Sequence, residues 1–125
     1  MTIKEVSKQF KISQDTLRYY ERVGMIPPVQ RTAGGIRNYG EDDLKWVELV
    51  LCMRSAGLPI EVMVEYVKLY QEGEHTIPDR LQLLVAQREV LMKQKKQIED
   101  TIAHLDYKIS RYKIAEETGK LVWDK

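Results

Sequence analysis

The chain has 125 residues, one domain with room for an appended helix, and its 43% hydrophobic and 31% charged residues exclude a disordered chain. No run approaches the roughly 20 apolar residues of a membrane span, and a single cysteine, Cys52, excludes an internal disulfide framework. The net charge of +1 hides an asymmetry, because residues 1–40 carry seven Lys or Arg against three acidic residues, which weakly favours a nucleic-acid surface there.

Compartment and cofactor content follow from the same residues. The N-terminus lacks the charged-then-apolar pattern of a signal peptide, and a lone thiol fits a reducing environment, so we expect a cytoplasmic protein. Two histidines and one thiol cannot supply a structural zinc set, and the sequence has no recognisable nucleophile–base pair or phosphate-cradling glycine loop. We therefore expect no metal, no other cofactor and no enzymatic activity.

The N-terminal segment predicts two short helices. Thr2 and Glu5 have the spacing of a capping box at the start of the first helix. Ser13 is a good N-cap for a second helix over about 14–23, which Gly24 ends. Two short helices across a three-residue turn form a helix-turn-helix arrangement.

A change of pattern follows the second helix. Residues 29–32 and 36–39 are short segments on either side of Ala33-Gly34-Gly35, a tight-turn signal. We predict a small β-hairpin here, the wing of a winged helix-turn-helix domain, and a flexible loop is the alternative.

Two further helices complete the predicted DNA-binding domain, residues 1–75. A third helix runs from a Gly40 cap to about Ala56. Pro59 suits the first position of a fourth helix, which runs to about Glu72.

The last helix, predicted over 76–118 and followed by a short tail at 119–125, has a coiled-coil pattern. Eight of its ten seam positions are apolar over five heptads. The seam positions are Leu84, Leu91, Ile98, Leu105 and Tyr112 in one column, and Leu81, Arg88, Lys95, Ile102 and Ile109 in the other. A helix this long needs a partner, so we predict a homodimer, and a helix folded back on its own domain is the alternative.

Several side chains are candidates for DNA contact. On the second helix Leu17 and Tyr20 can face the core, which leaves the opposite face for the duplex. The candidates are Thr16, near the helix start, for a base edge, Arg18, Tyr19 and Arg22 for phosphates, and Arg31, Arg37 and Tyr39 in the predicted wing. A solvated face is the alternative for the arginines, and core packing is the alternative for the tyrosines.

Two motifs resemble the signature of MerR-family transcription regulators. Thr-Leu-Arg-Tyr-Tyr-Glu-Arg at 16–22 is followed by Gly24 and a Pro-Pro pair, and Arg-Thr-Ala-Gly-Gly-Ile-Arg-Asn-Tyr occupies 31–39. The resemblance runs collinearly from about residue 3 to residue 66. Lys11 departs from it, because the family usually has a turn glycine at that position.

The resemblance implies a fold and a mechanism. The fold is mostly α-helical, a winged helix-turn-helix domain with a long C-terminal helix that dimerises as an antiparallel coiled coil. Such dimers bind a pseudo-palindromic operator in double-stranded promoter DNA, and they bend and untwist it so that RNA polymerase aligns with both promoter elements. We therefore expect an activator of transcription.

We expect Cys52 to be the residue that senses the signal to which this regulator responds. The sequence has no cysteine pair near residue 118, unlike the family's metal sensors, and Cys52 falls on a polar strip with Lys45, Glu48 and Ser55. This pattern resembles the AdhR/NmlR-like subgroup, which responds to aldehydes and related electrophiles. The helix C-terminus disfavours a thiolate, so reactivity requires a cation from the partner's long helix, which offers Arg88, Lys93, Lys95 and Lys96.

Other interpretations of the sequence stay open. Cys52 is either a sensor, an inert packed thiol or a residue with another role. A small organic ligand held between subunits is a second possible signal, with Trp46, Tyr66 and Tyr70 lining an aromatic pocket or simply packing in the core. A coiled-coil module that docks protein is a rival of a different class, which salt-dependent binding to duplex DNA would exclude.

Overall fold

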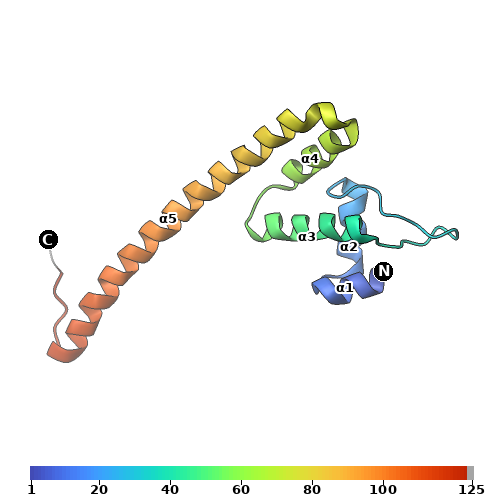
Figure 1. The fold of residues 1–125 in the computed structure, drawn as a ribbon. Coiled ribbons are helices and arrows are strands. Elements are labelled where there is room, and N and C mark those ends of the chain that lie inside the picture. The colour runs from blue at the N-terminus through green and yellow to red at the C-terminus, as the bar shows by residue number, and fades with distance from the viewer. Residues whose placement is uncertain (124–125) are drawn as a thin grey trace. The chain divides into compact units, whose positions relative to one another are not determined.

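The computed structural model describes residues 1–123 and is 74% helical. Its helices are α1 (Ile3–Phe10), α2 (Gln14–Val23), α3 (Glu41–Ser55), α4 (Ile60–Glu72), the 3₁₀ turn η1 (Glu74–Thr76) and α5 (Ile77–Thr118) (Figure 1). The chain divides into two compact units, Met1–Gln87 and a second that begins at Arg88 within α5. The mostly helical, helix-turn-helix part of the predicted fold is therefore confirmed.

Local hydrogen bonds define the helix-turn-helix. The Glu5 amide donates to the Thr2 hydroxyl at 3.1 Å, and the Thr2 amide donates to the Glu5 carboxylate at 2.9 Å, which is the expected capping box. Lys11 ends α1 in the left-handed region, with φ of 58°. Ser13 then caps α2 by accepting from the Thr16 amide at 3.0 Å. The second helix has the predicted bounds.

The core of the first unit lies among α1 to α4 and the segment before α3. Tyr20 is buried, as expected for a residue that faces away from the proposed DNA surface. The other buried apolar residues include Val6, Leu17, Met25, Ile26, Val29, Tyr39, Val47, Val50, Met53, Leu58, Met63 and Val67. This core fixes α2 and the start of α3 relative to each other.

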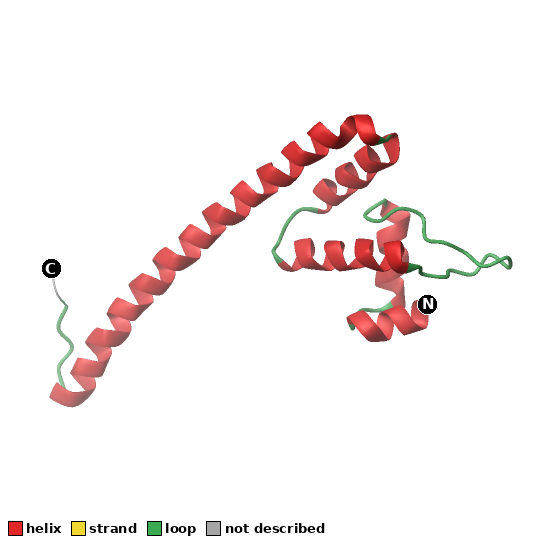
Figure 2. Cartoon of the chain, in the orientation of Figure 1, coloured by secondary structure: helices red, strands yellow, loops and turns green. Residues whose placement is uncertain are grey.

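The predicted β-hairpin is wrong for the described residues, because no strand forms between α2 and α3 (Figure 2). The segment does fold back on itself: Arg31 and Arg37 form one isolated antiparallel bridge, and the Thr32 amide donates to the Ile36 carbonyl at 2.8 Å. A two-stranded ribbon of such short, exposed arms has too little packing to extend into strands. We call residues 31–39 the wing loop.

The start of α4 also differs from the prediction. Pro59 is the extended N-cap of α4, with φ of −65° and ψ of 149°, rather than its first helical residue. Gly57 in the left-handed conformation ends the preceding turn, and the Leu58 amide donates back to the Met53 carbonyl at 3.0 Å. The helix therefore begins one residue later than predicted.

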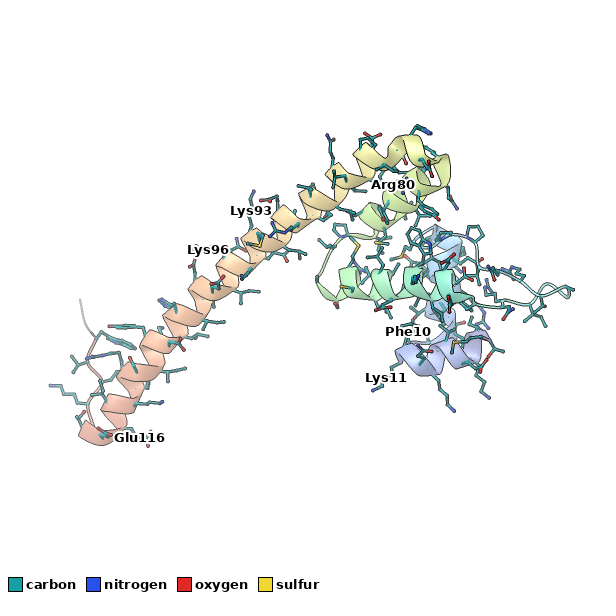
Figure 3. All side chains as sticks on the ribbon, viewed as in Figure 1. Phe10, Lys11, Arg80, Lys93, Lys96 and Glu116 are labelled. Carbon is teal, nitrogen blue, oxygen red and sulfur yellow. The ribbon has the colours of Figure 1, made fainter. Side chains whose placement is uncertain are left out.

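The long helix α5 buries none of its side chains in the single chain. Its seam residues are exposed, apart from a half-buried Leu91, and the side chains of residues 88–118 project outward, as Lys93 and Lys96 do in Figure 3. Gly119, with φ of 77°, then turns the chain, and the Trp123 ring lies 5.9 Å from the Tyr112 ring. Of the predicted tail, residues 124 and 125 lie outside the described residues.

Candidate nucleic-acid interface

The exposed face of α2 carries polar side chains that interact with one another. The Arg18 guanidinium lies 2.9 Å from the Asp15 carboxylate and donates to the Gln14 side chain at 3.3 Å. The Thr16 hydroxyl lies 2.8 Å from the Ser13 hydroxyl at the start of the helix. This pair places the candidate base-contacting residue within the first turn of α2.

A second cluster lies one turn further along α2. The Arg22 guanidinium stands 5.5 Å from the centre of the Tyr19 ring, a cation–π distance. Tyr19 is half-buried and Arg22 is exposed. The two side chains therefore interact outside the fully buried core.

Glu21 joins α2 to the wing loop. Its carboxylate accepts from Arg37 Nε at 2.7 Å and from the Val29 amide at 2.8 Å, and it lies 3.6 Å from the Arg31 guanidinium. The side chain of Glu21 is only 11% exposed. Two wing arginines are thus held against the second helix by one carboxylate.

The electrostatics of Glu21 reflect these contacts. Burial is the largest single influence and raises the pKa of Glu21. The hydrogen bonds from the Arg37 side chain and the Val29 amide, with the charges of Arg37 and Arg31, outweigh burial and hold the pKa below its ordinary value. The carboxylate is therefore ionised at neutral pH and acts as a fixed anchor for both guanidinium groups.

Asp43 and Met1 secure the base of the wing loop. The Asp43 carboxylate accepts from the Gly40 amide at 2.9 Å, which caps α3, and from the Gln30 amide at 3.4 Å. The Tyr39 amide donates to the Met1 carbonyl at 2.7 Å. Backbone contacts at both ends leave the loop little freedom where it meets the core.

Tyr39 does not lie on the candidate surface. Its ring is 2% exposed, and its hydroxyl is buried without a hydrogen-bond partner. Burial raises the pKa of this phenol, although the nearby Arg37 charge opposes the shift. The expectation that Tyr39 contacts DNA is corrected, because the end of the wing loop turns its side chain into the core.

Cys52 lies near the end of α3 and is exposed. Its backbone carbonyl accepts from the Ser55 hydroxyl at 2.8 Å. Lys45, Glu48 and Ser55 are exposed too, as the predicted polar strip requires. The thiol is therefore accessible in the single chain.

Sequence reasoning missed the role of Glu21. It stood inside the motif at 16–22, but nothing in its local pattern pointed to Arg37, which is 16 residues away. Its only signal in the sequence was its place between Arg18 and Arg22 in that motif. The hydrogen bond from the Gln30 amide to the Asp43 carboxylate was also not foreseen.

Residues 1–123, the described part of the chain, contain neither a metal-binding cluster nor a membrane-spanning helix. No group of three or more His, Cys, Asp or Glu side chains gathers in a metal-binding arrangement there. None of the helices in that range combines the length and the apolar character that crossing a membrane requires.

These features define a helix-turn-helix protein with two arginines on its second helix and an arginine-bearing loop held beside it. Residues 1–69 match the family model described as MerR HTH family regulatory protein, and residues 44–107 match the model described as MerR, DNA binding. The chain belongs to the MerR family of helix-turn-helix regulators.

Individual relatives agree with this assignment. The chain is 51% identical over 92 residues to the HTH-type transcriptional regulator AdhR of Bacillus subtilis (strain 168), a match that covers 74% of this chain and 66%, just under two thirds, of AdhR. It is similar to a putative MerR family transcriptional regulator from Listeria monocytogenes, with 42% identity and a TM-score of 0.87 over 90% of this chain and 86% of that one.

A third relative was solved with DNA. HiNmlR, a MerR family regulator lacking the sensor domain, was crystallised bound to promoter DNA, and it is 28% identical, with a TM-score of 0.84 over 96% of this chain and 95% of its own. All three relatives are transcription regulators and none is an enzyme, in agreement with the sequence-based expectation.

Proposed function

We propose that this chain is a dimeric regulator that binds promoter DNA through α2 and the wing loop, distorts it and thereby activates transcription. The observation that carries the proposal is the Glu21 carboxylate, which holds Arg37 and Arg31 beside the helix that bears Arg18 and Arg22. Four guanidinium groups on α2 and the adjoining wing loop, two of them held by one carboxylate, suit a row of phosphates. HiNmlR, which was solved on promoter DNA, supports the same use of this fold.

The proposed contacts divide by chemistry. Thr16 lies at the start of α2, where a recognition helix approaches base edges in the major groove. Arg18, Tyr19, Arg22, Arg31 and Arg37 contact phosphates. In the Arg18–Asp15 pair the Asp15 side chain is 94% exposed and the Arg18 side chain 43%, so the pair is worth less than about 1 kcal/mol and a phosphate can displace the carboxylate.

Dimerisation through α5 is the second part of the proposal. Ile98, Ile102, Leu105 and Ile109 are each at least half exposed on α5. A stripe of this kind on a water-exposed helix favours burial against a second copy. We propose the antiparallel arrangement, in which two DNA-binding units reach two half-sites.

In the activation step, part of the free energy of DNA binding is used to deform the promoter. Bending and untwisting a promoter of this length costs several kcal/mol, on the order of 1–6. Contacts from two copies of α2 and two wing loops offset that cost. RNA polymerase then meets promoter elements at a spacing it can use, and the regulator acts in the cytoplasm where it meets polymerase.

Cys52 is the proposed entry point of the signal, an aldehyde or a related electrophile. The thiol is exposed, and 51% identity to AdhR over 92 residues supports assignment to the AdhR/NmlR-like subgroup. In the reaction the sulfur bonds to the carbonyl carbon, the carbonyl π bond opens onto oxygen, and the thiol proton ends on that oxygen. The adduct would alter packing near α3 and shift the dimer between two DNA-bound states.

A footprint on the chain's own upstream region, with and without an aldehyde, tests the proposal. We expect protection in both conditions, with steeply salt-dependent binding and an altered cleavage pattern at the centre of the site when aldehyde is present. Cys52→Ser should bind equally well but lose the aldehyde response, because serine is far less nucleophilic. A chain that binds no duplex DNA at low salt contradicts the DNA-binding part, and an aldehyde response retained by Cys52→Ser contradicts the sensor part.

A further inference from the structure

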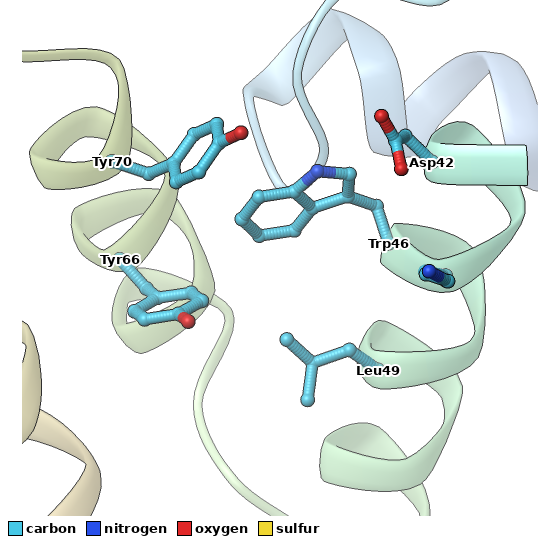
Figure 4. A pocket seen from close by; sticks show the side chains of 6 residues that line it. Asp42, Trp46, Leu49, Tyr66 and Tyr70 are labelled. Atoms are coloured by element: carbon cyan, nitrogen blue, oxygen red, sulfur yellow. The ribbon is translucent and has the colours of Figure 1, made fainter. Parts of the chain in front are cut away.

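Three aromatic rings from α3 and α4 surround a pocket (Figure 4). The Trp46 ring lies 5.6 Å from Tyr66 and 5.1 Å from Tyr70, and the second pair meets edge to face. Leu49 completes the apolar lining. The volume is about 260 Å³, which is just below the range of pockets that hold drug-sized molecules and suits a single ring with one small substituent.

The mouth of the pocket is electrically balanced. Asp42 and Lys45 both line it, one helical turn apart on α3. Within the described residues 1–123, neither side chain forms an ion pair. The Arg80 guanidinium lies 5.5 Å from the centre of the Tyr70 ring, so the ring that forms one wall of the pocket already makes a cation–π contact.

We propose that this pocket binds a small aromatic molecule of no net charge. The edges and faces of Trp46, Tyr66 and Tyr70 offer the tilted and edge-to-face contacts that another ring prefers. For an organic cation, repulsion from Lys45 and from the Arg80 charge behind Tyr70 offsets the attraction of Asp42 and of the ring faces. An organic anion is disfavoured by Asp42 and by the negative faces of the rings. Asp42 and Lys45 instead accept from and donate to a hydroxyl or carbonyl on the ligand.

A ligand bound in this pocket can affect the wing loop through α3. Asp42 precedes Asp43, whose carboxylate holds Gly40 and Gln30 at the base of the loop. A ligand that ties the first two turns of α3 to α4 therefore acts on the element that fixes the loop. Binding of the ligand to this pocket requires neither DNA nor Cys52. A failed binding experiment would therefore leave the proposed function unaffected, and a failure of the proposed function would leave ligand binding unaffected.

Fluorescence of Trp46 tests the proposal directly. The chain has two tryptophans, and Trp123→Phe leaves Trp46 as the single reporter in the full-length protein. We expect benzyl alcohol to change its emission saturably, with one site per chain. Benzoate and benzyltrimethylammonium, which keep the ring and add a charge, should each bind about tenfold more weakly.

Variants separate the pocket from unspecific effects. Tyr70→Leu removes one wall at a half-exposed position that the fold tolerates, and it should weaken benzyl alcohol binding about tenfold. Tyr107→Leu, which makes the same change in the second unit of the chain, is the matched control and should bind like the parent. Saturation-transfer NMR on the same samples detects binding that leaves the emission unchanged.

Three outcomes would overturn the proposal. The first is the absence of saturable binding by both fluorescence and NMR, as expected if a second copy fills the pocket. The second is equal binding of the neutral and charged probes. The third is a Tyr70→Leu variant that binds as tightly as the Tyr107→Leu control.

Discussion

Glu21 is the residue on which the candidate interface depends most. Its carboxylate accepts hydrogen bonds from the Arg37 side chain in the wing loop and from the Val29 amide just before the loop, and it holds the Arg31 guanidinium by charge. Asp15, also on α2, makes an ion pair of similar length with Arg18 but is almost fully exposed. The two acids differ in burial rather than in distance, and burial decides how much each contributes.

Glu21→Gln should therefore lower the free energy of unfolding by about 1–2 kcal/mol, because it replaces charge-assisted hydrogen bonds with neutral ones. Asp15→Asn is the matched control and should cost less than about 0.5 kcal/mol. Urea denaturation of both variants measures the difference. Equal effects of the two substitutions would mean that the Glu21 contacts do not hold the loop.

The effect of Glu21→Gln on the free energy of unfolding should depend on pH. The pKa of Glu21 is lower in the folded chain than its ordinary value of 4.5, so its contribution is fully present above that value and is lost as pH falls through the folded pKa. The stability difference between parent and Glu21→Gln should thus be constant near neutrality and shrink below about pH 4.5. A difference that stays unchanged down to pH 3 would contradict the assignment of a lowered pKa.

Lys11 offers a second residue-scale prediction. It adopts a φ of 58° at the turn between α1 and α2, a conformation that costs a residue with a Cβ about 1–2 kcal/mol. Lys11→Gly removes that strain but adds freedom to the unfolded chain, so a net stabilisation of about 0.5–1 kcal/mol is expected. Thermal unfolding of Lys11→Gly against Lys11→Ala, which keeps the Cβ, measures it. A glycine variant no more stable than the alanine variant would contradict it.

At the scale of elements, the helices could be predicted and the wing loop could not. The bounds of α2 follow from Ser13 and Gly24, which act on the backbone within a few residues of themselves. The wing loop depends instead on contacts between residues far apart in sequence: Glu21 with Arg37, Asp43 with Gln30 and Met1 with Tyr39. The tight-turn signal between its two short segments resembled a hairpin, but a hairpin also needs packing against other parts of the chain, which the local sequence does not reveal.

The candidate site divides in the same way. Arg18, Arg22 and Thr16 could be assigned to an exposed face from helical spacing alone, since the core side of α2 was recognisable from Leu17 and Tyr20. The orientation of Tyr39 could not, because it depends on how the chain enters α3 behind the Gly40 cap.

Arg18 lies on the exposed face of α2, whereas Arg37 also holds the wing loop, so replacing these two arginines should have different effects on DNA binding and stability. Arg18→Ala should weaken operator binding and lower the salt slope by about one phosphate contact, with stability nearly unchanged. Arg37→Ala should weaken binding more, because it also releases Glu21 and so loosens the loop. Anisotropy titrations at several salt concentrations, with urea denaturation alongside, separate the two effects. Unchanged stability in Arg37→Ala would leave that residue as a phosphate contact alone.

At the scale of the whole molecule, α5 has an exposed apolar stripe that needs a partner helix, and the single chain does not supply one. Its 42 residues bury no side chain, yet apolar residues recur along the predicted seam. A helix of this kind is stable in water chiefly when its apolar stripe is covered. The basic positions Arg88 and Lys95 interrupt that stripe, so the apolar contacts that hold a pair together lie mostly on either side of them.

Ile98 provides the sharpest test of that interpretation. It is 60% exposed in the single chain and lies near the middle of α5, so in an antiparallel pair the two copies of this residue lie close together. Ile98→Asp should cost the isolated helix little, but it would place two carboxylates in one interface, where burial and mutual repulsion are both unfavourable. Gln97→Asp is the matched control, because it introduces the same charge one position away from the seam.

Light scattering should find the parent and Gln97→Asp as dimers and Ile98→Asp as a monomer. Operator affinity should fall with the loss of the dimer by a factor of about 10² or more, because each half-site is then bound alone. Circular dichroism checks that the DNA-binding unit, which has its own buried core, remains folded in the variant. A dimeric Ile98→Asp with parental affinity would show that the seam is not the interface, and the exposed stripe of α5 would then need another partner.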